Sequence, residues 1–330
     1  MSGITAKHIS AIVPIYNVEV YLGECLRTLF GQSIASDIEY IFIDDAGTDG
    51  SMAILRNEIA KHPQLDITVL THDVNKGLAA ARITGITHAK SEYIMCIDSD
   101  DFMHPQMAEI LLSEALLRDA DIVMSPHIIH YPDHEKAVRF RSSNFDLNKI
   151  PISVLHFSLW GKIIRRSLFN RYSLFPVAGR NCWEDLATTA RAMAVTNRIG
   201  IVDMPLYYYR QNPSSLSHTN HKRRLDDHLF YADFLTKWFE SQGDDFYNKH
   251  LTLIERIKFC AKIKMLRGDV IEITRWKTTY PTSSRRIFTL AKQFGLAYRI
   301  AFMALNLCPT RLAIAIVKLI GKIAQSAHRR

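Results

Sequence analysis

Three carboxylates stand close together directly after an apolar run in the first third of the chain. Residues 93–97 are mostly apolar and predict a strand buried on both faces, and Asp98, Asp100 and Asp101 follow it. Carboxylates this close repel one another, so we expect a cation to neutralise them. Asp98 and Asp100 could approach one hard divalent ion such as Mg²⁺ or Mn²⁺, leaving positions for phosphate oxygens and water. A turn that caps the next helix is the alternative.

Polar side chains also follow the first two predicted strands. Residues 9–15 and 38–43 are apolar runs of strand length, and they lead into Tyr16 and into Asp44-Asp45. The carboxyl ends of parallel strands meet at one edge of a sheet, and ligands bind just beyond that edge. Three polar strand ends at one edge therefore predict a pocket suited to a nucleotide.

Strands that alternate with helices would position these residues. Further strands are expected at residues 67–70 and 122–125, and helices at about 21–29, 51–61, 78–88 and 105–118, with Asp49 or Ser51 as an N-cap. This alternation predicts βαβ units, a mostly parallel sheet and an α/β fold. No Gly-x-x-x-x-Gly-Lys-Ser/Thr occurs and no Gly-x-Gly-x-x-Gly follows the first strand, so a P-loop or dinucleotide enzyme is not expected.

Composition and charge bound the class of protein. Hydrophobic residues make up 48% and charged residues 22% of the 330 residues, which suits one large globular domain with an extension, or two domains. The formal net charge is +8, and basic residues gather towards the C-terminus, so an anionic partner or surface is expected. The five cysteines are scattered and predict neither a disulfide framework nor a zinc site, and Cys25 and Cys96 read as core residues.

The N-terminus lacks the apolar core of a signal peptide, and no run of about 18 uninterrupted apolar residues occurs. We therefore expect a cytoplasmic protein without a membrane span. His127, His130 and His134 fall in a stretch, residues 127–148, that reads as an exposed loop or hairpin. Solvated histidines are favoured there over a metal site.

Four short blocks in the first third of the chain carry a family resemblance. They are residues 12–17, 44–51, 75–77 with 81–82, and 98–101. In this combination and order they resemble the family 2 glycosyltransferases with the GT-A fold, of the bacterial cell-surface or exopolysaccharide type. Ala46-Gly47 stands where the family usually has Gly-Ser, which should alter the loop slightly and keep both neighbouring aspartates.

The resemblance implies a nucleotide-sugar donor site. Pro14 and Tyr16 would line the base and the ribose, and Asp45 would bind the nucleobase. Asn75 and Arg82 would border the donor pocket. An ordinary position on a helix surface is the alternative for Arg82.

The resemblance also implies a divalent metal, Mn²⁺ or Mg²⁺, on the diphosphate of the donor. Asp100 would hold the metal, and Asp98 would add a second carboxylate near the ribose. The metal and nearby cations such as Arg210 or Lys162 would offset the charge that grows on the leaving group. One further carboxylate would then suffice as a general base, because a metal-bound leaving group needs no protonation.

Motifs of the acceptor half extend the resemblance to about residue 220. Glu184-Asp185 opens a predicted helix, whose N-terminal dipole would help to keep a carboxylate ionised, as a general base requires. The resemblance implies Asp185 as that base, with Glu184, Trp160 and Lys162 at the acceptor and Arg210 near the donor. A plain helix cap is the alternative for Glu184-Asp185.

The predicted function is that of an inverting, metal-dependent glycosyltransferase. It would move a sugar from a nucleotide-diphosphate donor, expected to be a UDP-sugar, to a hydroxyl of a glycan or lipid-linked acceptor in cell-surface polysaccharide synthesis. A sugar nucleotidyltransferase would need a Gly-rich phosphate loop where Tyr16 stands. A non-catalytic glycan- or membrane-binding module is disfavoured because Asp98, Asp100 and Asp185 occur together.

Two regions are expected. Residues 1–220 would form the GT-A catalytic domain, with a nucleotide-sugar-binding half, 1–102, and an acceptor half, 103–220. Residues 221–330 would form a helical extension, with helices at 223–238 and 246–265. Residues 272–276 are similar to the Gln-x-x-Arg-Trp motif of processive synthases but lack the Gln, so we interpret that similarity as chance.

Basic amphipathic helices are expected near the C-terminus. Arg285, Lys292 and Arg299 would share one helix face, and a second helix would place Lys318 and Lys322 one turn apart. Such helices suit the interface of an anionic membrane, which would place the enzyme on the inner face of the cytoplasmic membrane. Packing on the catalytic domain or a homo-oligomer is the alternative, and no nucleic acid partner is expected.

Overall fold

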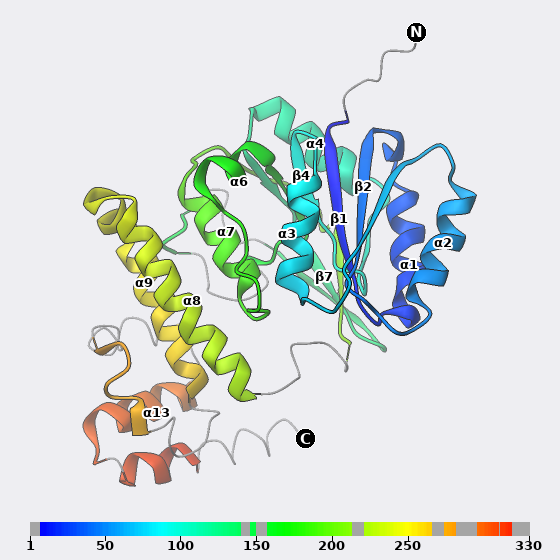
Figure 1. The fold of residues 1–330 in the computed structure, drawn as a ribbon. Coiled ribbons are helices and arrows are strands. Elements are labelled where there is room, and N and C mark those ends of the chain that lie inside the picture. Colours follow the sequence, from blue (N-terminus) through cyan, green and yellow to red (C-terminus); the bar gives the residue numbers. More distant parts are fainter. Residues whose placement is uncertain are drawn as a thin grey trace. The chain divides into compact units, whose positions relative to one another are not determined.

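The computed structural model describes residues 7–139, 146–149, 157–212, 221–265, 274–281, 296–309 and 311–318. The chain divides into two compact units. The first comprises Met1–Phe145 and Phe157–His218, and the second comprises Asp146–His156 and Thr219–Arg330. The first unit is an α/β structure and the second is helical (Figure 1).

The first unit is built on a seven-stranded sheet in the order β10-β6-β9-β4-β1-β2-β3. The strands are β1 (Ile9–Ile15), β2 (Ile38–Asp44), β3 (Asp66–Thr71), β4 (Tyr93–Cys96), β6 (Ile122–Met124), β9 (Lys162–Arg165) and β10 (Ile199–Ile201). Strands β1 to β4 are parallel to one another where they pair, and β10 is parallel to β6, whereas β9 lies antiparallel between β4 and β6. The predicted strands and the mostly parallel sheet are therefore confirmed.

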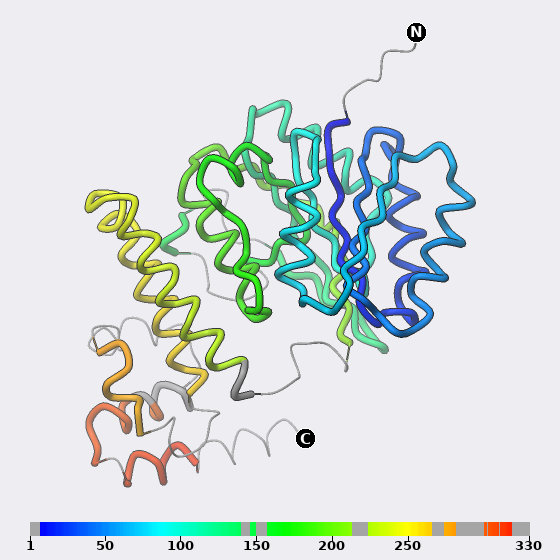
Figure 2. Tube along the Cα trace, viewed as in Figure 1, coloured from blue at the N-terminus to red at the C-terminus, as the bar shows by residue number. Residues whose placement is uncertain are grey.

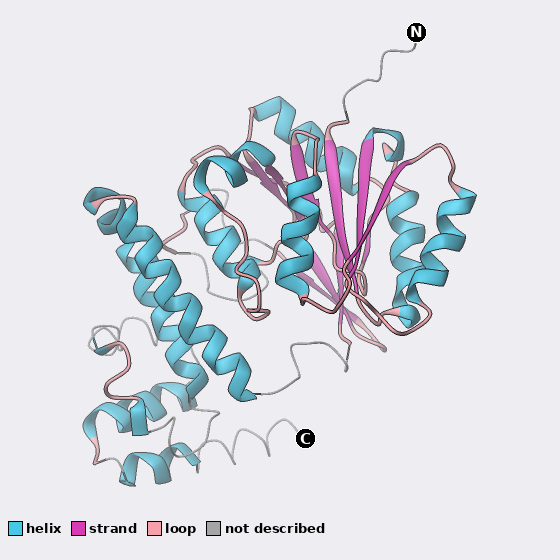
Figure 3. Cartoon of the chain, viewed as in Figure 1, coloured by secondary structure: helices cyan, strands magenta, loops and turns pink. Residues whose placement is uncertain are grey.

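Helices flank this sheet (Figure 3). They are α1 (Glu19–Phe30), α2 (Ser51–Lys61), α3 (Leu78–His88), α4 (Met107–Arg118), α6 (Arg166–Tyr172) and α7 (Glu184–Ala194), with a 3₁₀ turn at Ala35–Asp37. Helix α3 packs on β1 and β2. The approach is close, since a Cβ at Gly85 would come within 2.3 Å of Ile12 Cγ2.

Asp49 caps two helices. Its Oδ1 accepts a hydrogen bond from the Ser51 N–H at 3.0 Å and its Oδ2 from the Glu19 N–H at 2.9 Å. These are the first residues of α2 and α1. Asp49 thus accepts N–H groups at helix N-termini, as a capping residue does, although Gly50 occupies the N-cap position of α2.

Pro14 opens the sheet at the edge that carries the polar residues. Pairing of β1 with β4 ends at Ile12 and Cys96, followed by one bond from the Ile97 N–H to the Ile12 carbonyl. Along a parallel strand, alternate residues face alternate neighbours, so Pro14 faces the side of β4 beyond this last bond. The missing N–H of proline costs no ladder bond there. Strand β1 then continues to Ile15 beside β2 alone.

A second sheet was not predicted. It has the order β5-β11-β7-β8, formed by β5 (Phe102–Met103), β7 (His127–His130), β8 (Glu135–Val138) and β11 (Tyr207–Arg210). Strands β7 and β8 form the hairpin that was one of two expectations for residues 127–148, of which 140–145 lie outside the described residues. The prediction of solvated histidines is wrong for His127, which is buried.

The second unit contains helices α8 (His221–Ser241), α9 (Asp244–Lys264) and α13 (Leu296–Leu307) and a helical segment at residues 311–318. Helices α8 and α9, as predicted from the sequence, run side by side (Figure 2). The short link between them contains Gly243, whose φ of 101° favours glycine.

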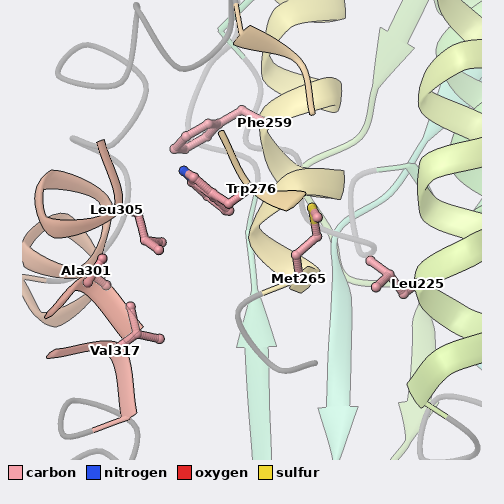
Figure 4. Close-up of a cluster of buried hydrophobic side chains, with 8 residues drawn as sticks. Leu225, Phe259, Met265, Trp276, Ala301, Leu305 and Val317 are labelled. Carbon is pink, nitrogen blue, oxygen red and sulfur yellow. The ribbon is translucent and has the colours of Figure 1, made fainter. Parts of the chain in front are cut away.

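An apolar cluster forms the core of the second unit (Figure 4). It contains Leu225, Phe259, Met265, Trp276, Ala301, Leu305, Ala313 and Val317. Trp276, the last residue of the segment similar to a synthase motif, is fully buried in this cluster. The predicted basic positions Arg285, Lys292 and Lys322 lie outside the described residues, as do 272–273.

Candidate active site

The polar strand ends meet where the order of the sheet changes direction. The chain runs from β1 to β2 and β3 on one side, and then returns to place β4 on the other side of β1. Asp44 ends β2, and Tyr16, Asp45 and Asp98 follow β1, β2 and β4, so all four lie at one edge of three adjacent strands. In open parallel sheets this switch point is where ligands bind.

Strand β11 holds the acidic loop after β4 in place. The Asp98 N–H donates to the Tyr207 hydroxyl at 3.1 Å. The Arg210 N–H donates to Asp101 Oδ1 at 2.8 Å, and Arg210 Nε donates to the Asp100 carbonyl at 2.9 Å. Asp101 is 1% exposed, so it is a structural member of the loop.

The Arg210 side chain is committed to support of this loop. Its guanidinium pairs with Glu24 and lies 5.2 Å from the ring centroid of Tyr21 and 5.0 Å from that of Phe102. Sequence reasoning assigned Arg210 to the nucleotide sugar. The structure instead brings it to the backbone of the aspartates.

Asp98 and Asp100 fit a divalent cation. Asp98 Oδ1 accepts from Arg82, and Asp100 Oδ2 lies 3.4 Å from Asn212 Nδ2. The second oxygen of each carboxylate makes no hydrogen bond within the described part of the chain. Burial and the nearby Asp98 carboxylate raise the pKa of Asp100, and burial and both neighbours raise the pKa of Asp101. Bound positive charge would relieve this crowding.

The protein supplies few ligands to such an ion. Within the residues described, no group of three or more His, Cys, Asp or Glu side chains could hold a metal. Two carboxylates with open oxygens match Mg²⁺ or Mn²⁺, which commonly complete their shell with phosphate oxygens and water.

Arg82 joins the two halves of the site. Its Nη2 lies 2.6 Å from Asp98 Oδ1 and its Nη1 lies 2.6 Å from Glu184 Oε1. The arginine is 2% exposed, so the surface alternative is wrong. Burial alone would lower the pKa of Arg82, but the two carboxylates outweigh burial and raise it, which keeps the guanidinium charged.

Asp45 is buried and bonded within the protein. Its Oδ1 accepts from the Lys76 N–H at 2.9 Å and lies 2.6 Å from His72 Nδ1, and its Oδ2 accepts from the Gly77 N–H at 2.8 Å. The carboxylate thereby ties the loop before α3 to the end of β2. It has little surface left for the nucleobase that sequence reasoning assigned to it.

Asp44, which sequence reasoning passed over as a ligand, is the more open of the two. It is half-buried, and its Oδ1 accepts from the Gly47 N–H at 3.2 Å. Tyr16 is 48% exposed and Asn75 is exposed at the same edge, whereas Pro14 is buried. Tyr16, Asn75 and Asp44 are therefore accessible to a ligand, whereas the buried Pro14 only shapes the edge of the sheet.

Glu184 and Asp185 begin α7, as predicted. The preceding Trp183 is buried with a φ of 76°, a left-handed conformation that strains a residue other than glycine. Asp185 is half-buried, and its Oδ1 accepts from the Leu186 N–H at 2.7 Å.

Burial raises the pKa of both of these carboxyl groups. It raises the pKa of Asp185 to about 6, and burial together with Asp185 raises the pKa of Glu184 to about 8. The dipole at the N-terminus of α7, which was expected to help keep a carboxylate ionised, therefore acts against burial. A carboxylate with a pKa near 6 is ionised at neutral pH and basic enough to take a proton.

Lys162 and Trp160, both assigned to the acceptor from the sequence, are buried. Lys162 is 2% exposed, and its Nζ donates to the Ser158 carbonyl at 2.5 Å and the Trp160 carbonyl at 3.1 Å. Burial lowers the pKa of Lys162 to about 7. Trp160 is 4% exposed and stacks on Tyr207, with ring centroids 4.7 Å apart. The Lys162 amino group is thus bonded to backbone carbonyls of residues 158–160 and is not exposed to solvent.

Asn181 was missed by sequence reasoning. Its Oδ1 accepts from the Ala79 N–H at 3.2 Å, at the start of α3. The segment that leads to Glu184 therefore contacts α3 at two places, Ala79 and Arg82. A lone asparagine in a loop carries no sequence signal for such a contact.

Comparison with known proteins agrees with this geometry. The family described as Glycosyl transferase family 2 matches residues 10–174, half of the chain. The uncharacterized glycosyltransferase EpsJ of Bacillus subtilis is 31% identical over 231 residues, which cover 67% of this chain and 66% of EpsJ.

Solved structures with the same fold share little sequence with the chain. Residues 1–349 of S. aureus TarS in complex with UDP-GlcNAc have a TM-score of 0.62 at 17% identity and cover 97% of this chain and 92% of that one. The mannosyltransferase PcManGT from Pyrobaculum calidifontis, in complex with GDP-Man and Mn²⁺, has a TM-score of 0.53 at 14% identity, covering 96% and 86%. The chain belongs to glycosyl transferase family 2 and has its GT-A fold.

Proposed function

We propose that the protein is an inverting, metal-dependent glycosyltransferase. It moves one sugar from a UDP-sugar to a hydroxyl of a glycan or lipid-linked acceptor in cell-surface polysaccharide synthesis. The observation that carries this proposal is the bridge of Arg82 between Asp98 and Glu184. It puts a metal-binding carboxylate and the start of the helix with Asp185 on one buried guanidinium. The UDP-GlcNAc in TarS supports the choice of a UDP-sugar.

Asp185 does the chemistry in this mechanism. Its carboxylate takes the proton of the acceptor hydroxyl while that oxygen attacks the anomeric carbon, and the bond to the diphosphate breaks on the opposite face. The product therefore has the inverted configuration. Asp98 and Asp100 would hold Mn²⁺ or Mg²⁺, which supplies positive charge to the departing diphosphate. The Mn²⁺ in PcManGT supports this assignment.

The remaining residues of the site bind the donor or support the loops around it. We assign Asp44, in place of Asp45, to the nucleobase, because Asp44 is the more open carboxylate. Tyr16 and Asn75 are exposed at the donor edge, while Arg210 and Lys162 support the loops around it.

A panel of nucleotide sugars tests the proposal, because slow donor hydrolysis needs no acceptor. We expect the protein to hydrolyse at least one UDP-sugar with Mn²⁺ and to lose this activity in EDTA. Hydrolysis unaffected by EDTA would remove the metal from the mechanism. Release of diphosphate from a nucleoside triphosphate and a sugar phosphate would instead indicate a nucleotidyltransferase.

The second unit suits a membrane surface. Ile300, Met303 and Leu307 lie on one face of α13 and are 40%, 38% and 74% exposed, and Leu312 in the next helical segment is 52% exposed. Arg311 and Lys318 are exposed nearby in sequence. No helix in the described ranges has the length and apolarity to cross a bilayer. We propose that this face binds anionic lipid, where apolar and basic groups act together.

Vesicle binding separates this role from its alternatives. We expect vesicles with phosphatidylglycerol to bind the protein, more weakly as salt rises, and Leu307→Glu to weaken binding. Leu117→Glu is the control, because Leu117 is 81% exposed on α4 in the first unit. A dimer that Leu307→Glu dissociates, without vesicle binding, would show that the face joins two copies.

A further inference from the structure

Strand β11 presents its side chains alternately to two sides. Tyr207 and Tyr209 both stack on Trp160, with ring centroids 4.7 Å and 5.4 Å away and interplanar angles of 8° and 12°. Tyr208 stacks instead on Phe102 at 4.6 Å and 13°. The strand thus carries two tyrosines towards Trp160 and one away from it.

The two tyrosines on the Trp160 side differ in the state of their hydroxyl groups. Tyr207 is fully buried, and its hydroxyl accepts the Asp98 N–H at 3.1 Å. Tyr209 is half-buried, and its hydroxyl makes no hydrogen bond to any residue that the structure describes. The hydroxyl of Tyr207 therefore supports the acidic loop, while that of Tyr209, on the same side of the strand, is open to a ligand.

Tyr209 stands on β11 between two residues that bind the acidic loop, because Tyr207 accepts the Asp98 N–H and the Arg210 N–H donates to Asp101. Burial and the charges of Asp101, Asp98, Asp100 and Asp185, in that order, raise the pKa of Tyr209 to about 12. The Tyr209 phenol thus remains protonated at neutral pH, and the charges of Asp98, Asp100 and Asp185 contribute to the rise in its pKa. An acceptor whose hydroxyl reaches Asp185 beside the acidic loop would come near this part of β11.

We propose, on the basis of the proposed function, that Tyr209 is an acceptor-binding residue whose hydroxyl hydrogen-bonds to the acceptor sugar. Stacking on Trp160 fixes the ring, so the hydroxyl is presented in one place with little entropy left to lose. The buried Trp160 then acts on the acceptor through Tyr209. Tyr207 and Arg210, on either side, attach the same strand to the acidic loop.

The test compares Tyr209→Phe with Tyr208→Phe. Both changes remove one hydroxyl from a half-buried ring of the same strand, but Tyr208 stacks on Phe102 on the other side. Two rates are measured: hydrolysis of the UDP-sugar without acceptor, and transfer to the best p-nitrophenyl glycoside of a panel of β-linked glucose, galactose and N-acetylglucosamine. The loss of one hydrogen bond should raise the acceptor KM of Tyr209→Phe about three- to tenfold. Donor hydrolysis in that variant, and both rates in Tyr208→Phe, should stay at the wild-type level.

Two results would overturn this inference and leave the proposed function standing. One is an acceptor KM in Tyr209→Phe equal to that of Tyr208→Phe. The other is a parallel loss of donor hydrolysis in Tyr209→Phe, which would place the hydroxyl on the donor. Wild-type protein that hydrolyses no nucleotide sugar would overturn the proposed function and this inference together.

Discussion

Glu184 Oε1 lies 2.6 Å from Arg82 Nη1, on a guanidinium that also holds Asp98 Oδ1 at 2.6 Å. Arg82 and Glu184 are 102 residues apart in the sequence. One buried cation thus lies between a carboxylate that follows β4 and a carboxylate at the start of α7. Neither carboxylate keeps its partner if the arginine is removed.

The first prediction follows from this bridge. Arg82→Met should lower the free energy of unfolding by about 3–5 kcal/mol, because it leaves two carboxylates without their buried partner. Adding Glu184→Gln should restore part of the loss, since the buried carboxyl group that has lost its partner is then gone. Urea denaturation of the two single variants and the double variant measures this.

An exposed ion pair provides the control. Arg118 pairs with Glu114 on α4 with 65% of its side chain exposed, so Arg118→Met should change stability by about 1 kcal/mol or less. Effects of Arg82→Met and Glu184→Gln that simply add would argue that the bridge contributes nothing as a unit.

The second prediction concerns the base. Because the pKa of Asp185 is raised to about 6, the carboxylate loses its charge as the pH falls through 6, and activity should fall with it. Asp185→Asn should lower turnover about 10²- to 10⁴-fold and abolish this acid limb, with donor affinity unchanged. A pH–rate profile from about pH 5 to pH 8 checks both. Normal turnover in Asp185→Asn would move the base elsewhere, with Glu184 as the next candidate.

The third prediction separates the adjacent aspartates at the end of β2. Asp44→Asn should raise the Kd for the UDP-sugar and leave the thermal unfolding midpoint unchanged. Asp45→Asn should lower that midpoint, since Asp45 accepts the N–H groups of Lys76 and Gly77 and contacts His72. Calorimetric titration and thermal denaturation of both variants give the comparison. The opposite pattern would return the nucleobase to Asp45.

The fourth prediction concerns the metal. Asp100→Ala should abolish the dependence of donor binding on Mn²⁺ while the fold is kept, because removal of one crowded carboxylate relieves repulsion. Donor affinity is measured in Mn²⁺ and in EDTA for the wild type and the variant. Equal affinity of the wild type in the two buffers would contradict the proposed metal role.

The fifth prediction concerns Ala46, which stands where the family usually has glycine. Its φ is 58°, in the left-handed region, so Ala46→Gly should raise the free energy of unfolding by about 0.5–1 kcal/mol. Ala53→Gly, at an exposed position in α2, should lower it by a similar amount. A destabilised Ala46→Gly variant would mean that the gain in unfolded-state entropy is the larger effect.

Local patterns were enough to predict most elements of the first unit. The apolar run at residues 9–15 coincides with β1, and the helix at 78–88 coincides with α3. Both depend on short-range features: a continuous apolar run for a strand covered on both faces, and glycine at the turn before a helix. The three polar strand ends at one edge followed from the same alternation.

Contacts between distant segments could not be predicted in this way. Strand β11 is four residues long and pairs with β5 and β7, which lie far away in the chain. The burial of Lys162 and Asp45 likewise depends on loops that fold over them. From their residue types, Lys162 and Asp45 were both predicted to bind a ligand. In the structure each is buried and hydrogen-bonded to the backbone of a loop, which it supports.

The placement of β9 has a consequence for how the chain folds. Residues 162–165 are made last of the three strands β4, β6 and β9, yet they lie between the other two. Until they leave the ribosome, β4 and β6 each present an open apolar edge that invites pairing with another chain. The first 102 residues, although they carry Asp98 and Asp100, are therefore an incomplete sheet, and the edge of β4 stays unpaired until β9 inserts.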